Sequence, residues 1–429
     1  MLLTEYRLDL VIQAVRAALK MEHPSDAVLR HFFQEERIGS NERSLVAETL
    51  FGVLRHRLFL EYACTHGDIG QATARRMTLA YWIKFGGYNL REIEPLLKAK
   101  EADWLGKIKA IVTADLPLSI QAEFPDWIVE KLRAQYSDAE ILELGRSMQQ
   151  SAPLDLRVNT LLSARNEVLQ ALQADGMDAQ ATPYSPIGIR LKYKPALNKH
   201  ALFLSGKFEV QDEGSQLLGL LLAPKRNDMV VDFCAGAGGK TLQLGAMMNS
   251  QGRLYAWDIS EKRLTNLKPR LKRSGLSNVQ PQLIAHENDS KVKRLAGKID
   301  RVLVDAPCSG LGTLRRNPDL KYRQSAQSVA ELNVKQAAIL ASAARLLKQG
   351  GRLVYATCSL LHEENQAIVQ AFLAAHPDFA LLPAGEVLKQ QHVELAMGDY
   401  LQLTPQQHNT DGFFAAVLER KGVLQAEQS

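Results

Sequence analysis

The sequence predicts an α/β protein in which a doubly wound parallel sheet follows an all-helical region and a small α/β module. Two observations predict this architecture. After about residue 220, short apolar strands alternate with helices, which is the pattern of a parallel sheet covered by helices on both faces. Before about residue 140, apolar residues recur at three- and four-residue spacing, which indicates helices alone.

Residues 1–140 are predicted to form the all-α domain. The helical spacing is clearest in "LDLVIQAVRAALK" and "SNERSLVAETLFGVLRHRLFLEYAC". A further helix is expected at "PDWIVEKLRAQY", because it opens with Pro125 and Asp126, two residues that favour a helix N-terminus.

Residues 141–222 are predicted to form the small connecting module. The segments "LDLRVNTL" (154–161) and "IGIRLKY" (187–193) have the composition of strands. A helix is expected between them at 164–176, ending at a glycine, which is a common residue at a helix C-terminus.

Residues 223–421 are predicted to form the main sheet domain. Its helices are expected at 240–249, 261–273, 329–349 and 363–376, and its strands at 229–236, 252–260, 279–285, 300–308, 351–359 and 412–420. Pro269 lies inside the second helix, and since proline has no backbone N–H to donate, we expect it to bend or interrupt that helix.

The composition is that of a globular protein, with 46% hydrophobic and 23% charged residues. No apolar run approaches the ~20 residues of a membrane span, and the first residues lack the layout of a signal peptide, so we expect a cytoplasmic protein. The four cysteines, at positions 64, 234, 308 and 358, are too few and too scattered for a disulfide framework or a zinc site.

The net charge of +5 is unevenly distributed. Lysine and arginine gather in three runs, at 263–275, 291–301 and 314–323. Any one of these runs is most simply explained as a solvated helix face. Three of them close to the candidate active loops favour a nucleic-acid partner.

The stretch "CAGAGGKT" (234–241) is a glycine-rich turn between a predicted strand and a predicted helix. Cys234 stands where a phosphate-binding P-loop needs its first glycine, and Thr241 stands where a dinucleotide fingerprint needs its last. The next strand ends at Asp258, about twenty residues on, where a carboxylate can bind both hydroxyls of a ribose. The combination favours an adenosine-bearing cofactor, although the loop alone is also compatible with a turn that only packs strand on helix.

Two further cysteines lie at the carboxyl ends of predicted strands. Cys308 is in "VDAPCSGLG" (304–312) and Cys358 is in "YATCSLLHEEN" (355–365), and a serine follows each. A single cysteine of this kind is usually a small apolar residue of the core. Because the carboxyl ends of parallel strands meet at one edge of a sheet, we expect this pair to lie side by side at the ligand-binding edge.

These motifs together closely resemble the RNA cytosine-C5 methyltransferases, in particular the bacterial ribosomal-RNA branch (Sun, Fmu or RsmB). The resemblance rests on "CAGAGGKT", "DAPCSGLG", "RRNPD" and "ATCS" with "EEN", and on "GKFEVQDEGSQL" (206–217) upstream. The N-terminal helices resemble the NusB-like RNA-binding domain of that branch. The resemblance covers most of the chain and is strongest from about 200 to 420.

The resemblance implies a Rossmann-like class I methyltransferase domain that uses S-adenosylmethionine and no metal. It implies an RNA substrate, with ribosomal RNA preferred over transfer RNA, and a protein that acts as a monomer. A non-catalytic RNA-binding assembly factor and a P-loop NTPase are the alternatives from other classes.

The resemblance also assigns catalytic roles. Cys358 is the expected nucleophile, which adds to carbon 6 of the cytosine so that carbon 5 becomes reactive towards a methyl group. Cys308 is expected to assist product release, and Asp305 to hydrogen-bond or protonate the ring at nitrogen 3. The alternative mechanism has Cys308 as the nucleophile, as in the DNA cytosine methyltransferases.

The binding residues follow from the same motifs. Ala237 replaces a proline that is usual in the family loop, which makes the turn less rigid. Phosphate contacts are expected from Arg315, Arg316 and Lys321, with a plain surface loop as the competing interpretation. The expected cofactor contacts are Cys234, Ala235, Gly236, Ala237, Gly238, Gly239, Lys240, Asp258, Asp305 and an acidic residue after the third strand, which is Asp289 or Glu287.

Overall fold

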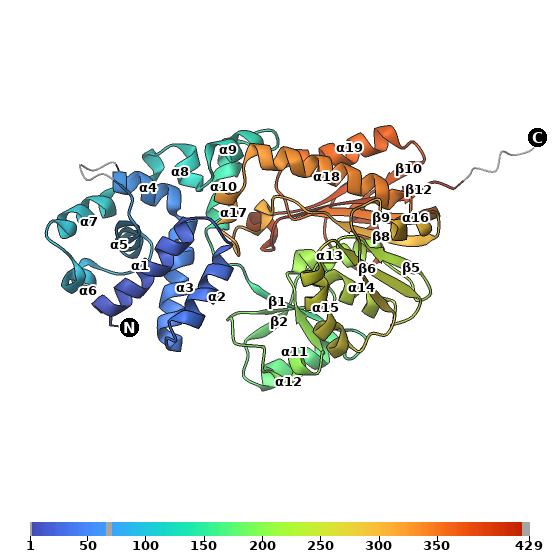
Figure 1. The fold of residues 1–429 in the computed structure, drawn as a ribbon, viewed down its shortest axis with the longest axis horizontal. Helices are drawn as coiled ribbons and strands as arrows, with labels where there is room; N and C mark the ends of the chain where they lie inside the picture. Colours follow the sequence, from blue (N-terminus) through green and yellow to red (C-terminus); the bar gives the residue numbers. More distant parts are fainter. Residues whose placement is uncertain (1, 66–70, 423–429) are drawn as a thin grey trace, which may run out of the picture. The chain divides into compact units, whose positions relative to one another are not determined.

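The computed structural model describes residues 2–65 and 71–422 (Figure 1). Its contacts divide the chain into two compact units, one made of residues 1–151 with 313–326 and the other of 152–312 with 327–429. The 313–326 segment thus lies within the sequence of the sheet domain but packs with the N-terminal helices. In the part of the chain that the structure describes, no helix is both long enough and apolar enough to cross a bilayer.

The first unit is all-helical, as predicted. Its core is built from the apolar faces of the longer helices, with Val11, Leu50 and Trp82 fully buried. The indole Nε1 of Trp82 donates to Thr49 Oγ1 at 3.0 Å, so the buried ring is also satisfied as a donor. The helices are α1 Glu5–Leu19, α2 Ser25–Glu35, α3 Ser40–Arg55, α4 Arg57–Thr65, α5 Ala74–Lys84, α6 Leu90–Ile93, α7 Glu101–Ala110, α8 Leu118–Ala122, α9 Asp126–Leu132, α10 Asp138–Met148 and α17 Leu320–Arg323.

The second unit begins with a small antiparallel sheet in the order β2-β3-β1-β4. Both strands and the helix predicted for this module are present, as β1, β3 and α11. Strands β2 and β4 are additions of three residues each, too short to give a period-two pattern. The elements are β1 Leu154–Val158, α11 Arg165–Ala174, β2 Ala179–Ala181, β3 Gly188–Leu191, α12 Ala201–Leu204 and β4 Phe208–Val210.

The main sheet has the order β10-β12-β9-β8-β5-β6-β7, with β11 pairing to β12. All six predicted strands are present, and the first five of them pair in parallel. The sixth, β12, runs antiparallel to β9, and the two unpredicted strands β10 and β11 both pair with it. The strands are β5 Met229–Asp232, β6 Arg253–Asp258, β7 Val279–Leu283, β8 Ile299–Asp305, β9 Leu347–Thr357, β10 Phe379–Leu382, β11 Tyr400–Leu403 and β12 Phe413–Arg420.

Helices cover both faces of this sheet (Figure 1). Neighbouring strand residues alternate between two cores: Val354 packs in one and Tyr355 in the other. One core contains α13 Glu213–Leu222, α14 Gly239–Met247, α15 Glu261–Ser274 and α20 Ala384–Gln390, and the other contains α16 Ser290–Arg294, α18 Ala326–Ala344 and α19 Gln366–Ala375. The short helix α21 Pro405–His408 precedes β12.

Pro269 does not interrupt its helix. Helix α15 continues through this residue, so the expected interruption does not occur.

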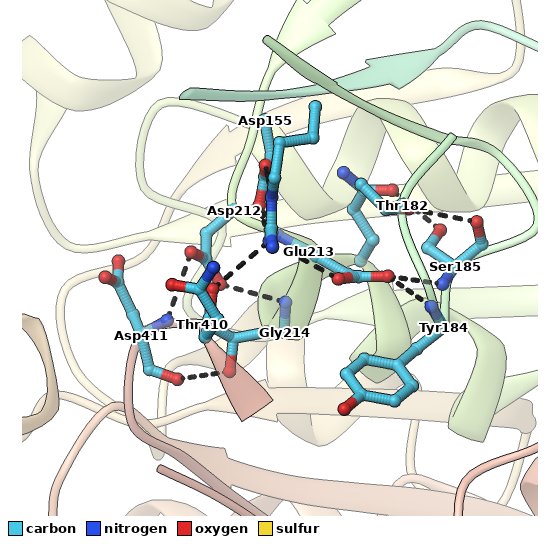
Figure 2. A network of polar contacts seen from close by, with 12 residues as sticks. Asp155, Thr182, Tyr184, Ser185, Asp212, Glu213, Gly214, Thr410 and Asp411 are labelled. Atoms are coloured by element: carbon cyan, nitrogen blue, oxygen red, sulfur yellow. Dashed lines mark hydrogen bonds and ion pairs between the residues drawn. The ribbon is translucent and has the colours of Figure 1, made fainter. Parts of the chain in front are cut away.

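A polar network joins the small module to the main sheet domain (Figure 2). Arg190 on β3 donates to both carboxylate oxygens of Asp155 on β1, at 2.7 and 2.9 Å. Glu213, fully buried at the start of α13, accepts from the backbone N–H groups of the module's 182–185 turn. Asp212 caps α13 and accepts from Asp411 N at 3.1 Å. The module is therefore tied to the loop that leads into β12.

The chain order reverses between the adjacent strands β5 and β8, since β6 and β7 extend the sheet on one side and β9 and β12 on the other. In open α/β sheets, ligands bind beyond the carboxyl ends of the strands at such a reversal. The glycine-rich loop follows β5, and Asp305 ends β8. The fold thus places the predicted motifs at one edge of one sheet.

Candidate active site

The glycine-rich loop connects β5 to α14 in a tight turn. Gly236 and Gly238 have φ of +56° and +84°, a region that favours glycine. A Cβ on Gly238 would collide with Leu267, whereas one on Gly236 would meet nothing within 4 Å. The loop is therefore packed closely on one side and open on the other, as a backbone that receives a ligand must be.

Two arginines that the sequence did not single out support this loop from below. Arg157 on β1, fully buried, donates to Gly239 O at 2.5 Å, and Arg270 on α15 donates to Ala237 O at 2.7 Å. Arg270 and Arg273 also pair with the buried carboxylate of Glu209. Part of the basic run 263–275 is thus used inside the protein instead of facing a nucleic acid.

Asp258 lies at the end of β6 beside the glycine-rich loop, as predicted. Its side chain is buried, and its carboxylate accepts from Gly236 N at 2.8 Å and from Ser260 N at 2.7 Å. The next residue, Ile259, is 70% exposed although it is apolar. A fixed carboxylate with an exposed apolar side chain beside it suits a ligand that carries both a ribose and a flat ring.

The acidic residues after β7 differ in what they bond. Asp289 is the N-cap of α16, where it accepts from Lys291 N at 2.8 Å and from Ala285 N at 2.9 Å. These backbone hydrogen bonds lower the pKa of Asp289. Glu287 accepts from the neighbouring Asn288 amide. Asp289 therefore has a clear role in shaping the loop, and its contact with a cofactor stays a prediction.

Asp305 and Lys240 form an ion pair at the carboxyl end of β8. Lys240 Nζ lies 2.7 Å from Asp305 Oδ2, and both side chains are largely shielded from solvent. Burial disfavours the charged ammonium, but the Asp305 carboxylate outweighs it and raises the pKa of Lys240. Lys240 is thus engaged with an active-site carboxylate and does not have the role of a P-loop lysine.

A second carboxylate, Asp232, lies at the end of β5 and was not predicted from the sequence. It is 1% exposed and accepts from Thr241 Oγ1 at 2.6 Å. Burial raises the pKa of Asp232 to about 7, and the nearby Asp305 carboxylate adds to that effect. Thr241, which stands at the last position of the dinucleotide pattern, therefore fastens the start of α14 to β5.

The two predicted cysteines lie side by side, as expected. Cys308 Sγ is 3.4 Å from Cys358 Sγ, and both residues are free and partly exposed. Strands β8 and β9 are parallel neighbours, with Asp305 in register with Ala356. The hydrogen bond with Cys358, then burial, raise the pKa of the Cys308 thiol well above its ordinary value.

Lys321, predicted to contact RNA, is instead buried in the helical unit at 4% exposure. Its Nζ donates to the carbonyl oxygens of Arg55 and Glu123, at 2.9 and 2.7 Å, and lies 3.5 Å from Glu123 Oε2. Burial raises the pKa of Glu123 to about 7 and lowers that of Lys321 to about 8. This ammonium is not available to a phosphate, so the structure does not support the predicted contact between Lys321 and RNA.

The two arginines predicted to contact phosphates differ in exposure. Arg315 is buried, at 3% exposure, whereas Arg316 is partly exposed and stays a candidate for a phosphate contact.

Replacing Lys321 by Met tests its structural role. The change leaves the Glu123 carboxylate buried without its cation, so we expect the free energy of unfolding of the helical unit to fall by about 3 kcal/mol. The midpoint of thermal unfolding, followed by circular dichroism, should fall accordingly, whereas Lys107→Met, at an exposed position of α7, should not change it. Unchanged stability combined with weaker RNA binding would instead support the original assignment.

Fold and site together define a class of protein. The strand order, the open glycine-rich loop and the acidic residues at the strand ends are those of a Rossmann-like methyltransferase that uses S-adenosylmethionine. The residues present fit this cofactor, because the open side of Gly236 admits a ligand and Asp258 is fixed beside it.

Comparison with known proteins identifies the family. The family model described as 16S rRNA methyltransferase RsmB/F matches residues 219–419, and the model of the RsmF/B-like ferredoxin-like domain matches residues 124–198. The chain belongs to this RsmB/F family of RNA methyltransferases. Its helical N-terminal unit fits the NusB-like domain expected from the sequence.

Three relatives illustrate the similarity. The probable ribosomal RNA small subunit methyltransferase B of Synechocystis is 31% identical, over 92% of this chain and 95% of that one. The ribosomal RNA small subunit methyltransferase B of Salmonella newport is 30% identical, over 96% and 98%. The crystal structure of PH0851 superposes with a TM-score of 0.79 at 26% identity, over 98% of this chain and all of that one.

Loss of Asp258 should weaken cofactor binding. Asp258→Ala removes a fixed carboxylate and releases Gly236 N, and since a charge-assisted hydrogen bond contributes about 1.5–3 kcal/mol, we expect the Kd for S-adenosylmethionine to rise about 10- to 100-fold. Calorimetric titration of the purified protein measures this Kd. Glu261→Ala, at an exposed position of α15, is the matched control and should bind like the unmodified protein. An unchanged Kd for Asp258→Ala would move the ribose contact elsewhere.

Proposed function

We propose that this protein methylates carbon 5 of a cytosine in small-subunit ribosomal RNA, through a covalent adduct between Cys358 and carbon 6. The observation that carries the proposal is the pair of free thiols 3.4 Å apart at the ends of β8 and β9. The names of the relatives, which are small-subunit rRNA methyltransferases, support the choice of RNA.

The chemistry gives each thiol a task. Carbon 5 of cytosine is a weak nucleophile, and addition of the Cys358 sulfur to carbon 6 gives carbon 5 enamine character. S-adenosylmethionine, when bound, supplies the methyl group that carbon 5 takes. A base then takes the proton from carbon 5, and the electrons of that C–H bond restore the double bond between carbons 5 and 6. The bond between Cys358 Sγ and carbon 6 breaks in the same step, and the sulfur leaves as a thiolate with the electrons of that bond.

The surroundings of the two sulfurs favour Cys358 as the nucleophile. The raised pKa of Cys308 keeps it protonated, with a nearby Glu364 carboxylate contributing to that effect after the Cys358 hydrogen bond and burial. The Lys240 ammonium, in contrast, interacts favourably with Cys358. A protonated Cys308 beside the adduct suits a role in product release, and the reverse assignment remains the alternative.

Asp305 is proposed to contact nitrogen 3 of the cytosine. It lies at the end of β8, three residues before Cys308, and its carboxylate is held by Lys240 at 2.7 Å. A proton shared between the Asp305 carboxyl group and nitrogen 3 lowers the cost of adding a thiolate to the ring, because it accommodates the negative charge that addition delivers. The carboxyl group must carry this proton, since an ionised carboxylate and nitrogen 3 are both acceptors. The ion pair with Lys240 fixes the Asp305 side chain for this contact.

We further propose that the protein acts in the cytoplasm. Its monomeric state stays a prediction from the sequence.

Bisulfite sequencing of total RNA from cells with and without the gene tests the proposal. We expect one protected cytosine of small-subunit rRNA to lose its protection when the gene is absent. Purified protein and S-adenosylmethionine should restore 5-methylcytosine in unmodified rRNA. A loss confined to transfer RNA would favour a tRNA methyltransferase, and no loss in any RNA would favour a non-catalytic assembly factor.

A further inference from the structure

Three buried polar residues bond to the backbone and side chains on both sides of each active-site cysteine. Glu364 and Gln336 are fully buried, and Asn365 is 3% exposed. Glu364 ends the short helix His362–Glu364 that follows the Cys358 loop, and Gln336 lies on α18. We call these three residues the latch.

The latch holds the residues that flank Cys308. Glu364 Oε1 accepts from Ser309 N at 2.8 Å, and Glu364 Oε2 accepts from Ser309 Oγ. Gln336 Nε2 donates to Pro307 O and to Glu364 Oε1, both at 3.0 Å. The residue before Cys308 and the residue after it are therefore fixed to one cluster.

The same latch holds the residues that flank Cys358. Glu364 Oε2 also accepts from Ser359 Oγ, and Asn365 Nδ2 donates to Ser359 O at 3.0 Å. Asn365 Oδ1 accepts from Thr357 Oγ1 at 2.5 Å. A single carboxylate thus joins the two cysteine loops, and the two serine hydroxyls also lie 3.1 Å apart.

We propose that Glu364 is a positioning residue, which sets the distance and orientation of Cys308 and Cys358 relative to each other by bonding to both loops. This inference rests on the proposed function. A carboxylate suits the task because it accepts at both oxygens, so donors from two loops converge on one rigid group. Removing any one of these donors leaves part of a buried negative charge without a hydrogen bond, so the carboxylate favours the geometry in which all of its donors are present.

The chemistry needs such a device because two sulfurs must act on one cytosine ring in sequence. Cys358 must reach carbon 6 within bonding distance, and Cys308 must stay close enough to assist the departure of the product. A displacement of about 1 Å in a reacting group can cost about 100-fold in rate. The residues of the latch, which set this distance, are themselves buried.

Glu364→Gln tests the proposal with the smallest change in shape. The amide cannot accept at both positions, so we expect kcat to fall about 10- to 100-fold. The KM for RNA and the Kd for S-adenosylmethionine should stay within about twofold, because the glycine-rich loop and Asp258 are untouched. Glu386→Gln, at an exposed position of α20, is the matched control and should behave like the unmodified protein.

A second variant keeps the test decisive if Glu364→Gln does not fold. The double change Ser309→Ala with Ser359→Ala removes both hydroxyl donors and keeps the carboxylate. It should lower kcat in the same way, and this result alone tests the proposal if Glu364→Gln does not fold. If Glu364→Gln folds, adding it to the serine variant should cost less than Glu364→Gln alone costs, because the two changes break the same contacts. Either an unchanged kcat in the serine variant or fully additive losses would overturn the proposal.

Activity of the unmodified protein distinguishes failure of the proposed function from failure of the positioning role of Glu364. If it transfers no methyl group to carbon 5 of cytosine, the proposed function fails, whatever the variants do. If it does so, and Glu364→Gln matches it in kcat, only the positioning role of Glu364 is wrong.

Discussion

Cys358→Ala is expected to abolish methyl transfer to RNA. Without a thiolate at the end of β9, nothing adds to carbon 6, and carbon 5 keeps the low reactivity of an intact aromatic ring. We expect the rate to fall by about 10³-fold or more, the scale of loss when a covalent nucleophile is removed. Transfer of a radiolabelled methyl group to unmodified rRNA measures it.

The chain provides its own control for this experiment. Cys64 is fully buried in the helical unit, and burial raises the pKa of its thiol to about 12. Cys64→Ala removes a thiol of no catalytic use and should leave methyl transfer unchanged. If Cys358→Ala stays active while Cys308→Ala is inactive, the roles of the two cysteines are reversed.

The fold was predictable to a large extent because its long elements have strong periodicity. The six main strands are apolar runs flanked by helices, and all six are present. The antiparallel direction of β12 was not predictable, because strand direction depends on the 376–412 connection, whose strands β10 and β11 have four residues each. Pro269 does not interrupt α15, whose apolar residues pack in the core of the sheet, and a bend at Pro269 stays a prediction.

The site residues that follow strand ends were predictable from the sequence, whereas those that reach the site from distant positions in the chain were not. Cys308, Cys358, Asp258 and the glycine-rich loop were found because they are contiguous with strand ends, so topology alone brings them together. Arg157 acts on the loop from 82 positions away in the sequence, and no local pattern connects the two. The same holds for Gln336, which reaches the Cys308 loop from the middle of a helix.

Lys321 shows why a basic run is weak evidence for RNA binding. The 314–323 run has the composition of a surface loop, yet its lysine closes a buried ion pair with Glu123, almost 200 positions earlier in the chain. The sequence contains no signal for that pairing, since an isolated acidic residue in a helical region is ordinarily solvated. Charge near an active site must therefore be placed in three dimensions before it is assigned to a ligand.

Cys308→Ala is expected to trap the protein on its substrate. Methyl transfer to carbon 5 does not require Cys308, but departure of the Cys358 thiolate from carbon 6 does, so the covalent protein–RNA adduct should accumulate. Turnover should fall about 100-fold or more, the usual contribution of a positioned acid–base group. The adduct is measured as an RNA-bearing band that survives denaturing electrophoresis and requires S-adenosylmethionine.

The double variant Cys308→Ala with Cys358→Ala decides which sulfur holds the RNA. If Cys358 forms the bond, the adduct seen with Cys308→Ala must vanish in the double variant, because that variant lacks the thiols of both cysteine loops. An adduct that persists would require another nucleophile, and normal turnover in Cys308→Ala would show that the 3.4 Å contact between the two sulfurs has no part in release. Both thiols follow adjacent parallel strands, and the latch holds both of their loops, so each single variant removes one sulfur from the same structural setting. The loss of methyl transfer in Cys358→Ala and the accumulation of adduct in Cys308→Ala can therefore be assigned to the individual sulfurs.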